Sequence, residues 1–374
     1  MDPTLPPRPD TTPLPLLKVV SPGLSARTPI LSSRRPAVSI IVPARNEEAS
    51  LGDCLRSLVA QTNVPVEIIV VDDGSTDRTR EIAESFAGVR VISPCPLPAG
   101  WTGKNNAVVA GAEASRGEWL LFTDADTAHL PGSLERALAE AKENGVDMLS
   151  YSPEQIAVTF WEMAVLPVVF AELAHAYPPK QVSDPASPIA AANGQYILIR
   201  RDAYEAVGGH RAIAGELLED VALARVVKNS GRKLRFRYAA DAVRTRMYRN
   251  FHQLREGWTK NLALLFPQPG WLAAKLLFLW SVAWIMFFWA PVGFAGHRRP
   301  WWTSALILAP MYLGQRLRRA NFDWAMEVLG ALFGYPMFAY LLLRSKWAHT
   351  RGIVLWKDRA YSDSNKRRSL ATDH

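Results

Sequence analysis

Short apolar runs alternate with amphipathic segments over the first hundred residues. Residues 37–42, 66–71 and 89–92 are rich in β-branched side chains, which is typical of buried strands. Residues 47–61 and 79–86 separate them and have the apolar spacing of helices. Strands that alternate with helices predict βαβ units with right-handed crossovers. The pattern therefore predicts an α/β fold with a mostly parallel sheet flanked by helices.

A fourth apolar run, residues 119–123, ends in Asp124-Ala125-Asp126. In an extended chain alternate side chains point the same way, roughly 6 to 7 Å apart. Two carboxylates at this spacing suit one hard divalent cation, Mg²⁺ or Mn²⁺, which would offset their mutual repulsion. The alternative is an Asp-rich turn in which the side chains bond local backbone N–H groups.

Polar turns also follow the first two predicted strands. Pro43, Ala44 and Glu47 belong to the first turn, and Asp72-Asp73 to the second. In parallel sheets ligands bind beyond the carboxyl ends of the strands, so these turns and the Asp pair at 124 and 126 predict one pocket. Neither the G-x-G-x-x-G of dinucleotide-binding folds nor a P-loop signature occurs, which disfavours both classes.

Three further features are candidates for chemistry. Gly103-Lys104 lies in a Gly-rich turn that opens a helix through residue 114, where an ammonium and free N–H groups would bind phosphate. The alternative is a solvated Lys in a loop. Glu219-Asp220 begins a helix over 221–228, a place where the helix dipole stabilises acids in many proteins. His210 follows two glycines, where a structural histidine is the ordinary outcome.

The blocks 38–48, 67–77 and 122–126, in this order and spacing, resemble the family 2 glycosyltransferases, whose catalytic domain has the GT-A fold. The resemblance implies that Asp72 and Asp73 contact the nucleotide base and ribose. It implies that Asp124 and Asp126 bind the metal and the sugar nucleotide, and it makes Asp220 the general base. The implied donor-binding residues are Pro43, Ala44, Glu47, Asp72, Asp73, Gly103, Lys104 and Asp124, with Glu219 as the alternative base and His210 as a further metal or pocket candidate.

Long uncharged runs dominate the last third of the chain. Residues 276–295 are long enough to span a bilayer as a helix, 328–343 are a second candidate, and 301–314 are uncharged but short. The formal charge of +8 fits nucleic acid or an anionic membrane. Because basic residues concentrate in 344–368 beside the apolar runs, a membrane partner is favoured and nucleic acid is not. Residues 156–177 are also apolar, but they contain two acids. They predict a helix in the membrane interface or over an acceptor groove, or alternatively a core helix.

The predicted organisation has five parts. Residues 1–36 form a Pro-rich, mobile N-terminus without a signal peptide, and 37–250 form the GT-A domain. An interfacial linker, 251–271, leads to membrane helices in 272–343 and a basic tail, 344–374. Two cysteines give no disulfide framework, which favours a reducing compartment. We therefore expect a multi-pass protein of the inner (plasma) membrane with a cytoplasmic catalytic domain.

The spacing of Gln253, Arg255 and Trp258 departs from the Q-x-x-R-W that processive members of the family resemble. The departure favours a single transfer to a lipid over polymer extrusion, with Trp258 or its neighbours near the membrane surface. The resemblance, nearest to carotenoid- and hopanoid-associated members, implies an inverting, metal-dependent transfer from a nucleotide diphosphate donor, such as a UDP-hexose, to a lipid or isoprenoid acceptor. The alternatives are a polysaccharide synthase and a non-catalytic membrane scaffold. The sequence leaves the sugar, the acceptor, the number of spans and the oligomeric state open.

Overall fold

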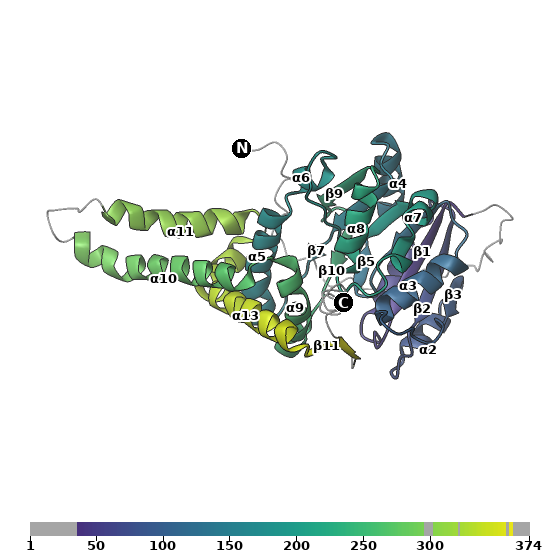
Figure 1. The fold of residues 1–374 in the computed structure, drawn as a ribbon, viewed down its shortest axis with the longest axis horizontal. Coiled ribbons are helices and arrows are strands. Elements are labelled where there is room, and N and C mark those ends of the chain that lie inside the picture. Colours follow the sequence, from purple (N-terminus) through teal and green to yellow (C-terminus); the bar gives the residue numbers. More distant parts are fainter. Residues whose placement is uncertain (1–35, 295–301, 321, 357–358, 362–374) are drawn as a thin grey trace, which may run out of the picture. The chain divides into compact units, whose positions relative to one another are not determined.

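Seven strands form one sheet in the order β3-β2-β1-β4-β8-β6-β9 (Figure 1). The computed structural model describes residues 36–294, 302–320, 322–356 and 359–361. Strand β8 is antiparallel to both of its neighbours, and the other neighbouring pairs are parallel. The strands are β1 (Val38–Ala44), β2 (Val66–Asp72), β3 (Val89–Ile92), β4 (Trp119–Phe122), β6 (Met148–Ser152), β8 (Ile197–Arg200) and β9 (Leu234–Tyr238). The predicted α/β class with a mostly parallel sheet is confirmed.

Helices cover both faces of this sheet, which explains why its strands are mostly apolar and do not alternate strictly between apolar and polar residues. In β1, Ile40 and Val42 belong to one core cluster and Ile41 to the other. The first cluster includes α1 (Leu51–Val59) and α4 (Ser133–Glu143). The second includes α3 (Gly103–Ala114) and α8 (Glu219–Asn229). Each fully buried aliphatic side chain stabilises the fold by about 1.5–3 kcal/mol, so the two clusters fix the positions of the strand ends.

Helix α1 begins four residues later than the sequence predicts. Asn46 has a positive φ of 53°, a conformation that asparagine tolerates better than most residues. Its N–H donates to Ser75 Oγ at 3.0 Å, and the N–H of Glu47 donates to Thr79 Oγ1 at 2.7 Å. Because the segment after β2 accepts these two bonds, residues 46 and 47 cannot belong to a helix, and the predicted start at Glu47 is wrong.

A second, three-stranded sheet follows the Asp124-Ala125-Asp126 turn. Its order is β5-β10-β7, with β5 at Thr127–His129, β10 at Val243–Thr245 and β7 at Glu154–Gln155. Strands this short leave little periodicity in a sequence, and we did not predict them. The small sheet brings residue 245 beside the turn that follows β4. The remaining short elements are α2 (Thr79–Glu84), α6 (Pro179–Ser183), α7 (Arg201–Ala206), η1 (Gly209–Arg211), β11 (Val354–Trp356) and β12 (Arg359–Tyr361).

The C-terminal helices pack around α5 (Phe160–Ala176) in a third core cluster. Val165, Val168 and Val169 of α5 are fully buried in it, so of the two predictions for this segment the core helix is the one observed. Trp258 is 4% exposed and packs on Tyr248 and Phe170. The ring of Trp258 thus packs in the third cluster, and the expectation that Trp258 or its neighbours lie near the membrane surface remains a prediction.

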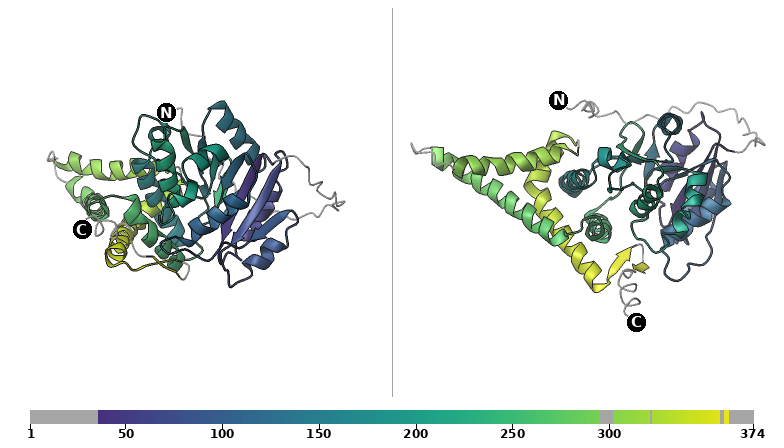
Figure 2. Two further views of the ribbon diagram at one scale, coloured as in Figure 1. Left: turned by 45° about the vertical axis from the view of Figure 1, so that its right-hand side comes forward. Right: turned by 45° about the horizontal axis from the view of Figure 1, so that its top comes forward.

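The other helices of this part are listed by their bounds: α9 (Phe251–Leu265), α10 (Pro269–Phe294), α11 (Trp302–Arg318), α12 (Trp324–Leu329), the π-helical η2 (Gly330–Gly334) and α13 (Tyr335–Arg351). Helices α10 and α11 lie side by side in Figure 2. In the part of the chain that the structure describes, one continuous helix, Trp324–Arg351, is long and apolar enough to cross a membrane. The bent pair of α9 and α10 passes the same test only when the two helices are joined.

The predicted spans fall on α10, α11 and the helix formed by α12, η2 and α13, while Ala295 and Trp301 lie outside the described residues. The predicted mobile N-terminus, apart from Pro36, also lies outside them, as do 357–358 and 362–374 of the basic tail. The boundaries proposed at residues 250, 271 and 343 remain predictions.

Candidate active site

Helix α3 brings Lys104 to the carboxyl ends of the strands. Thr102 is the N-cap, and its Oγ1 accepts a hydrogen bond from Asn105 N at 3.1 Å. Gly111 lets the helix approach β1 closely, since a Cβ at this position would lie 2.5 Å from Ile41 Cγ2. Gly103 and Lys104 therefore form the first turn of a helix held tightly over the end of β1.

The Lys104 ammonium is shared by two carboxylates. Its Nζ lies 2.7 Å from Asp124 Oδ1 and 2.6 Å from Glu219 Oε1. Burial acts to lower the pKa of Lys104, but the charges of Asp124 and Glu219 outweigh it and hold that pKa well above its ordinary value. Asp124, in the turn after β4, thus bonds the Lys104 side chain of helix α3. This differs from the simple Asp turn that we considered as an alternative, in which the carboxylates bond local backbone N–H groups.

Asp220 is held by backbone N–H groups. Val221 N donates to its Oδ1 at 2.7 Å, and Gly194 N donates to its Oδ2 at 3.0 Å. Burial, followed by the neighbouring charge of Glu219, raises the pKa of Asp220 to about 6. For Glu219 burial also acts to raise the pKa, but Lys104 outweighs it and the pKa is lowered. The Lys104 ammonium thus lowers the pKa of Glu219, while the pKa of the adjacent Asp220 is raised. A raised pKa allows Asp220 to act as a base near neutral pH.

Gly194 leaves room for this arrangement. A Cβ at this position would lie 3.1 Å from both Glu219 Oε1 and Lys104 Nζ. Any side chain here would therefore push against the ion pair.

Lys260 of α9 is a site residue that we did not predict. Burial lowers its pKa, and among nearby charges Glu219 raises it while Lys104 lowers it further. Asp220 and Asp124 also act on it. Its backbone oxygen lies 2.8 Å from His349 Nε2, which ties α9 to α13 at this point. In the sequence Lys260 is one Lys in a helix of mixed composition, and only the fold brings it toward the carboxylates.

Five predicted site residues line one small cavity: Pro43, Lys104, Asp124, His210 and Glu219. The volume of about 10 Å³ is close to that of a single water site. His210 Nδ1 lies 3.0 Å from the Tyr204 hydroxyl, and burial lowers the pKa of His210 to about 4. The imidazole is therefore neutral near pH 7.

The other predicted donor residues lie along the ends of β1 and β2. Ala44 pairs with Asp72, and Asp73 N donates to Ala44 O at 2.9 Å. Asp72 Oδ1 accepts from Ser75 N at 3.1 Å, which is a local turn bond. Glu47 Oε2 accepts from Ser50 Oγ at 2.8 Å. These residues are not among those that line the small cavity, so the structure places them on the neighbouring stretch of the same sheet edge.

Asp126 follows Asp124 on the turn, and its backbone oxygen accepts from Thr245 Oγ1 at 3.1 Å. Within the described residues no group of three His, Cys, Asp or Glu side chains is placed to hold a metal ion. The metal-binding roles of Asp124, Asp126 and His210 therefore remain predictions.

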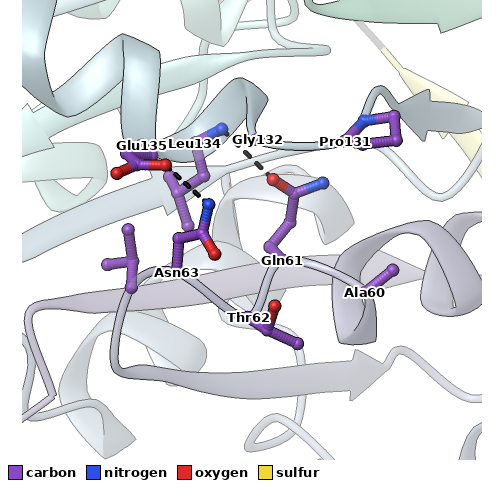
Figure 3. A pocket seen from close by; sticks show the side chains of 9 residues that line it. Ala60, Gln61, Thr62, Asn63, Pro131, Gly132, Leu134 and Glu135 are labelled. Carbon is purple, nitrogen blue, oxygen red and sulfur yellow. Dashed lines mark hydrogen bonds between the residues drawn. The ribbon is translucent and has the colours of Figure 1, made fainter.

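A larger cavity, of about 210 Å³, lies between the end of α1 and the start of α4 (Figure 3). Asn63 Nδ2 donates to Glu135 Oε2 at 2.7 Å, and Leu134 N donates to Gln61 Oε1 at 3.3 Å. Its polar groups bond one another, and it contains none of the predicted site residues. Size alone therefore does not mark the active site of this molecule.

Comparison with known proteins agrees with the resemblance seen in the sequence. Residues 39–208 match the family described as Glycosyl transferase family 2, so this part of the chain is a family 2 glycosyltransferase domain. It is similar to the 4,4'-diaponeurosporenoate glycosyltransferase of Staphylococcus aureus strain N315, at 28% identity over 363 residues, 91% of this chain and 92% of the relative. The same enzyme of strain USA300 is 29% identical over 366 residues, 92% of each chain.

Among solved structures, the chain is similar to a mannosyltransferase from Pyrobaculum calidifontis in complex with GDP-mannose and Mn²⁺. The TM-score is 0.47 at 17% sequence identity, over 84% of this chain and 87% of that one.

Proposed function

We propose that this glycosyltransferase moves a sugar from a nucleoside diphosphate donor, a UDP-hexose, to an O–H group of a lipid or isoprenoid acceptor, with inversion at the sugar. The observation that carries the proposal is the Asp220 carboxylate, with its pKa raised to about 6, beside the Lys104–Asp124–Glu219 cluster at the strand ends. A general base works best when its pKa lies near the working pH.

In the proposed step Asp220 accepts the proton of the acceptor O–H group while that oxygen bonds to C1 of the sugar. The bond from C1 to the phosphate oxygen breaks on the opposite face, and the nucleoside diphosphate leaves with the electron pair. Glu219 stays ionised beside Lys104 and keeps Asp220 basic through like-charge repulsion. Lys104 stabilises the negative charge on the leaving diphosphate.

Asp124 and Asp126 would hold a divalent cation, Mg²⁺ or Mn²⁺, with His210 as a further candidate. The charge of the site fits such an ion. Three carboxylates, of Asp124, Glu219 and Asp220, lie near the two ammonium groups of Lys104 and Lys260. Asp126, on the turn of Asp124, adds a fourth carboxylate. When bound, the ion supplies neutralisation of the diphosphate charge.

The nucleoside end of the donor takes the edge formed by β1 and β2. Pro43, Ala44 and Glu47 supply one side of it, and Asp72 and Asp73 accept hydrogen bonds from the base and ribose. Gly103, at the start of α3, brings free backbone N–H groups toward the diphosphate. The ends of β1, β2 and β4 then bind one extended donor.

The acceptor reaches this site from the inner (plasma) membrane. The name of the Staphylococcus aureus relatives supports a carotenoid-type acceptor, and the apolar helix Trp324–Arg351 supports membrane attachment. The protein is multi-pass, with the spans predicted on α10, α11 and α13, and its catalytic domain faces the cytoplasm. Nucleic acid is not a partner.

The test is transfer by the purified full chain in detergent. We expect labelled hexose to pass from one UDP-hexose, within a panel of nucleotide sugars, to a carotenoid acid or a polyprenol when Mn²⁺ is present, and we expect EDTA to stop it. The proposal is overturned if no nucleotide sugar in the panel binds with or without Mn²⁺. Polymer formation in the same assay would instead support the polysaccharide synthase alternative.

A further inference from the structure

A buried polar cluster lies directly beneath the Asp124-Ala125-Asp126 turn. It consists of the side chains Thr123, Thr127, His129, Gln195 and Thr245, none of which is more than 4% exposed. They come from both sheets and from the loop before β8. Burying five polar side chains costs free energy unless they form hydrogen bonds, so the partners of these side chains show what the cluster holds in place.

Two of its threonines hold the backbone of the turn. Thr127 Oγ1 donates to Asp124 O at 2.8 Å, and Thr245 Oγ1 donates to Asp126 O at 3.1 Å. Each hydroxyl has a single proton, which these bonds use. The two residues predicted to bind the cation are thus fixed by their carbonyl oxygens, and the carboxylate of Asp124 is held separately by Lys104.

The same cluster holds the loop that donates a hydrogen bond to the base. Thr123 Oγ1 donates to Gln195 O at 2.8 Å, and Gln195 Nε2 donates to Thr245 Oγ1 at 3.0 Å. The neighbouring Gly194 N donates to Asp220 Oδ2. A continuous chain of bonds therefore runs from the carbonyl of Asp126 to the carboxylate of the base.

Proton counting assigns the state of His129. Its Nε2 lies 3.0 Å from Thr123 Oγ1 and 3.3 Å from Thr127 Oγ1. Both hydroxyls have a carbonyl acceptor at 2.8 Å, so a ring proton on Nε2 satisfies their contacts with His129. Burial lowers the pKa of His129 to about 3, so the ring is neutral near pH 7.

We propose that Thr127 and Thr245 are positioning residues that hold the turn of Asp124 and Asp126 in register with the loop of Gly194 and Gln195, which bonds the base Asp220 of α8. Both act through backbone oxygens and touch neither donor nor acceptor. This inference rests on the proposed function for its catalytic meaning, but the register itself does not depend on any ligand. Thr245 is the better residue to test, because its single hydroxyl donates to Asp126 O of the turn and accepts from Gln195 Nε2.

The experiment compares Thr245→Val, Thr245→Ser and the wild-type protein by hydrogen exchange, without donor or metal. Valine keeps the shape and leaves one buried donor and one buried acceptor without a bond. We expect the amides of 124–127 and 194–196 to exchange about tenfold faster in Thr245→Val and at the wild-type rate in Thr245→Ser. Thr259→Val is the matched control, since the buried Thr259 hydroxyl bonds only Arg255 O within its own helix.

The second readout is the Mn²⁺ concentration that half-saturates donor binding. We expect it to rise about tenfold in Thr245→Val and to return with serine. Unchanged exchange in both segments, or faster exchange spread evenly over the sheet, would overturn the positioning role. A wild-type protein that binds no donor would overturn the proposed function instead, and the exchange result would still decide the register.

Discussion

Lys104 at the strand ends and Arg316 between the C-terminal helices each form an ion cluster. The first is partly exposed and the second is buried, and the two differ in charge balance. Lys104 bonds Asp124 and Glu219, with Asp220 next to them. In the other cluster Arg316 Nε donates to Glu172 Oε1 at 2.7 Å, and the second guanidinium nitrogen bonds the other oxygen. One cluster has more acids than its ammonium can neutralise, whereas the other pairs one cation with one anion.

This difference separates a reactive site from a structural contact. A bidentate pair satisfies itself, and Tyr312 completes it by accepting from Arg316 Nη1 at 2.7 Å. The strand-end cluster retains negative charge, a raised pKa at Asp220 and a small cavity, so it can take up a cation and a proton. We therefore expect substitutions in the first cluster to change turnover, and substitutions in the second to change stability.

The largest effect is expected from Asp220→Asn. An amide cannot accept the acceptor's proton, so turnover should fall by about 10²- to 10⁴-fold. The melting temperature should fall slightly, because the amide nitrogen cannot accept one of the two backbone N–H bonds that the carboxylate accepts. Asp53→Asn, an exposed acid on α1, is the control and should keep full turnover. Full turnover in Asp220→Asn would show that the base lies elsewhere.

Arg316→Met tests the balanced pair. It leaves the Glu172 carboxylate buried and unpaired, which should lower the free energy of unfolding by about 3–5 kcal/mol. Turnover per folded molecule should stay unchanged. The double variant Glu172→Gln/Arg316→Met should recover most of the loss, measured by denaturant unfolding in detergent. Equal losses in the single and double variants would contradict the pair as the cause.

Lys104→Met tests the unbalanced cluster from its cationic side. It removes the charge proposed to stabilise the leaving diphosphate, so turnover should fall by about 10²- to 10³-fold. Lys142→Met on the exposed side of α4 is the matched control. The role of Lys104 would be wrong if both variants kept the same turnover.

The smallest expected effect is on the pH dependence of the free energy of unfolding, through the buried side chain of His129. The pKa of His129 is about 3 in the fold and 6.5 when unfolded, so below about pH 6.5 the unfolded chain gains a proton that the folded chain does not. The free energy of unfolding should therefore decrease as the pH is lowered, by about 1.4 kcal/mol per pH unit for this residue. His129→Gln should make that fall shallower. Parallel curves for the two proteins from pH 6.5 to 5 would contradict a neutral buried His129.

The sequence was sufficient for the parallel strands and for most of the residues that meet at their ends. Residues 38–42 and 66–71 are mostly apolar, with Ser39 and Glu67 as the exceptions, because both faces of these strands are covered, and this leaves a clear signal. Pro43, Lys104, Asp124, His210 and Glu219 indeed line one cavity.

What the sequence could not provide depends on contacts between distant segments. The late start of α1 goes with bonds to residues 75 and 79, and the Trp258 ring of α9 is covered by Phe170 of α5 and by Tyr248 of the loop before α9. Lys260 and Thr245 reach the site only because α9 and β10 fold back beside it. None of these contacts leaves a periodic pattern in the chain.

The most direct test of the account is the pH dependence of sugar transfer. If Asp220 is the base, kcat should fall about tenfold per unit below pH 6 and level off above it, because the carboxylate must be unprotonated to accept the proton. The residual turnover of Asp220→Asn should lack this step. A wild-type rate that stays flat from pH 5 to 8, or a step that survives in Asp220→Asn, would contradict the proposed role of the strand-end cluster.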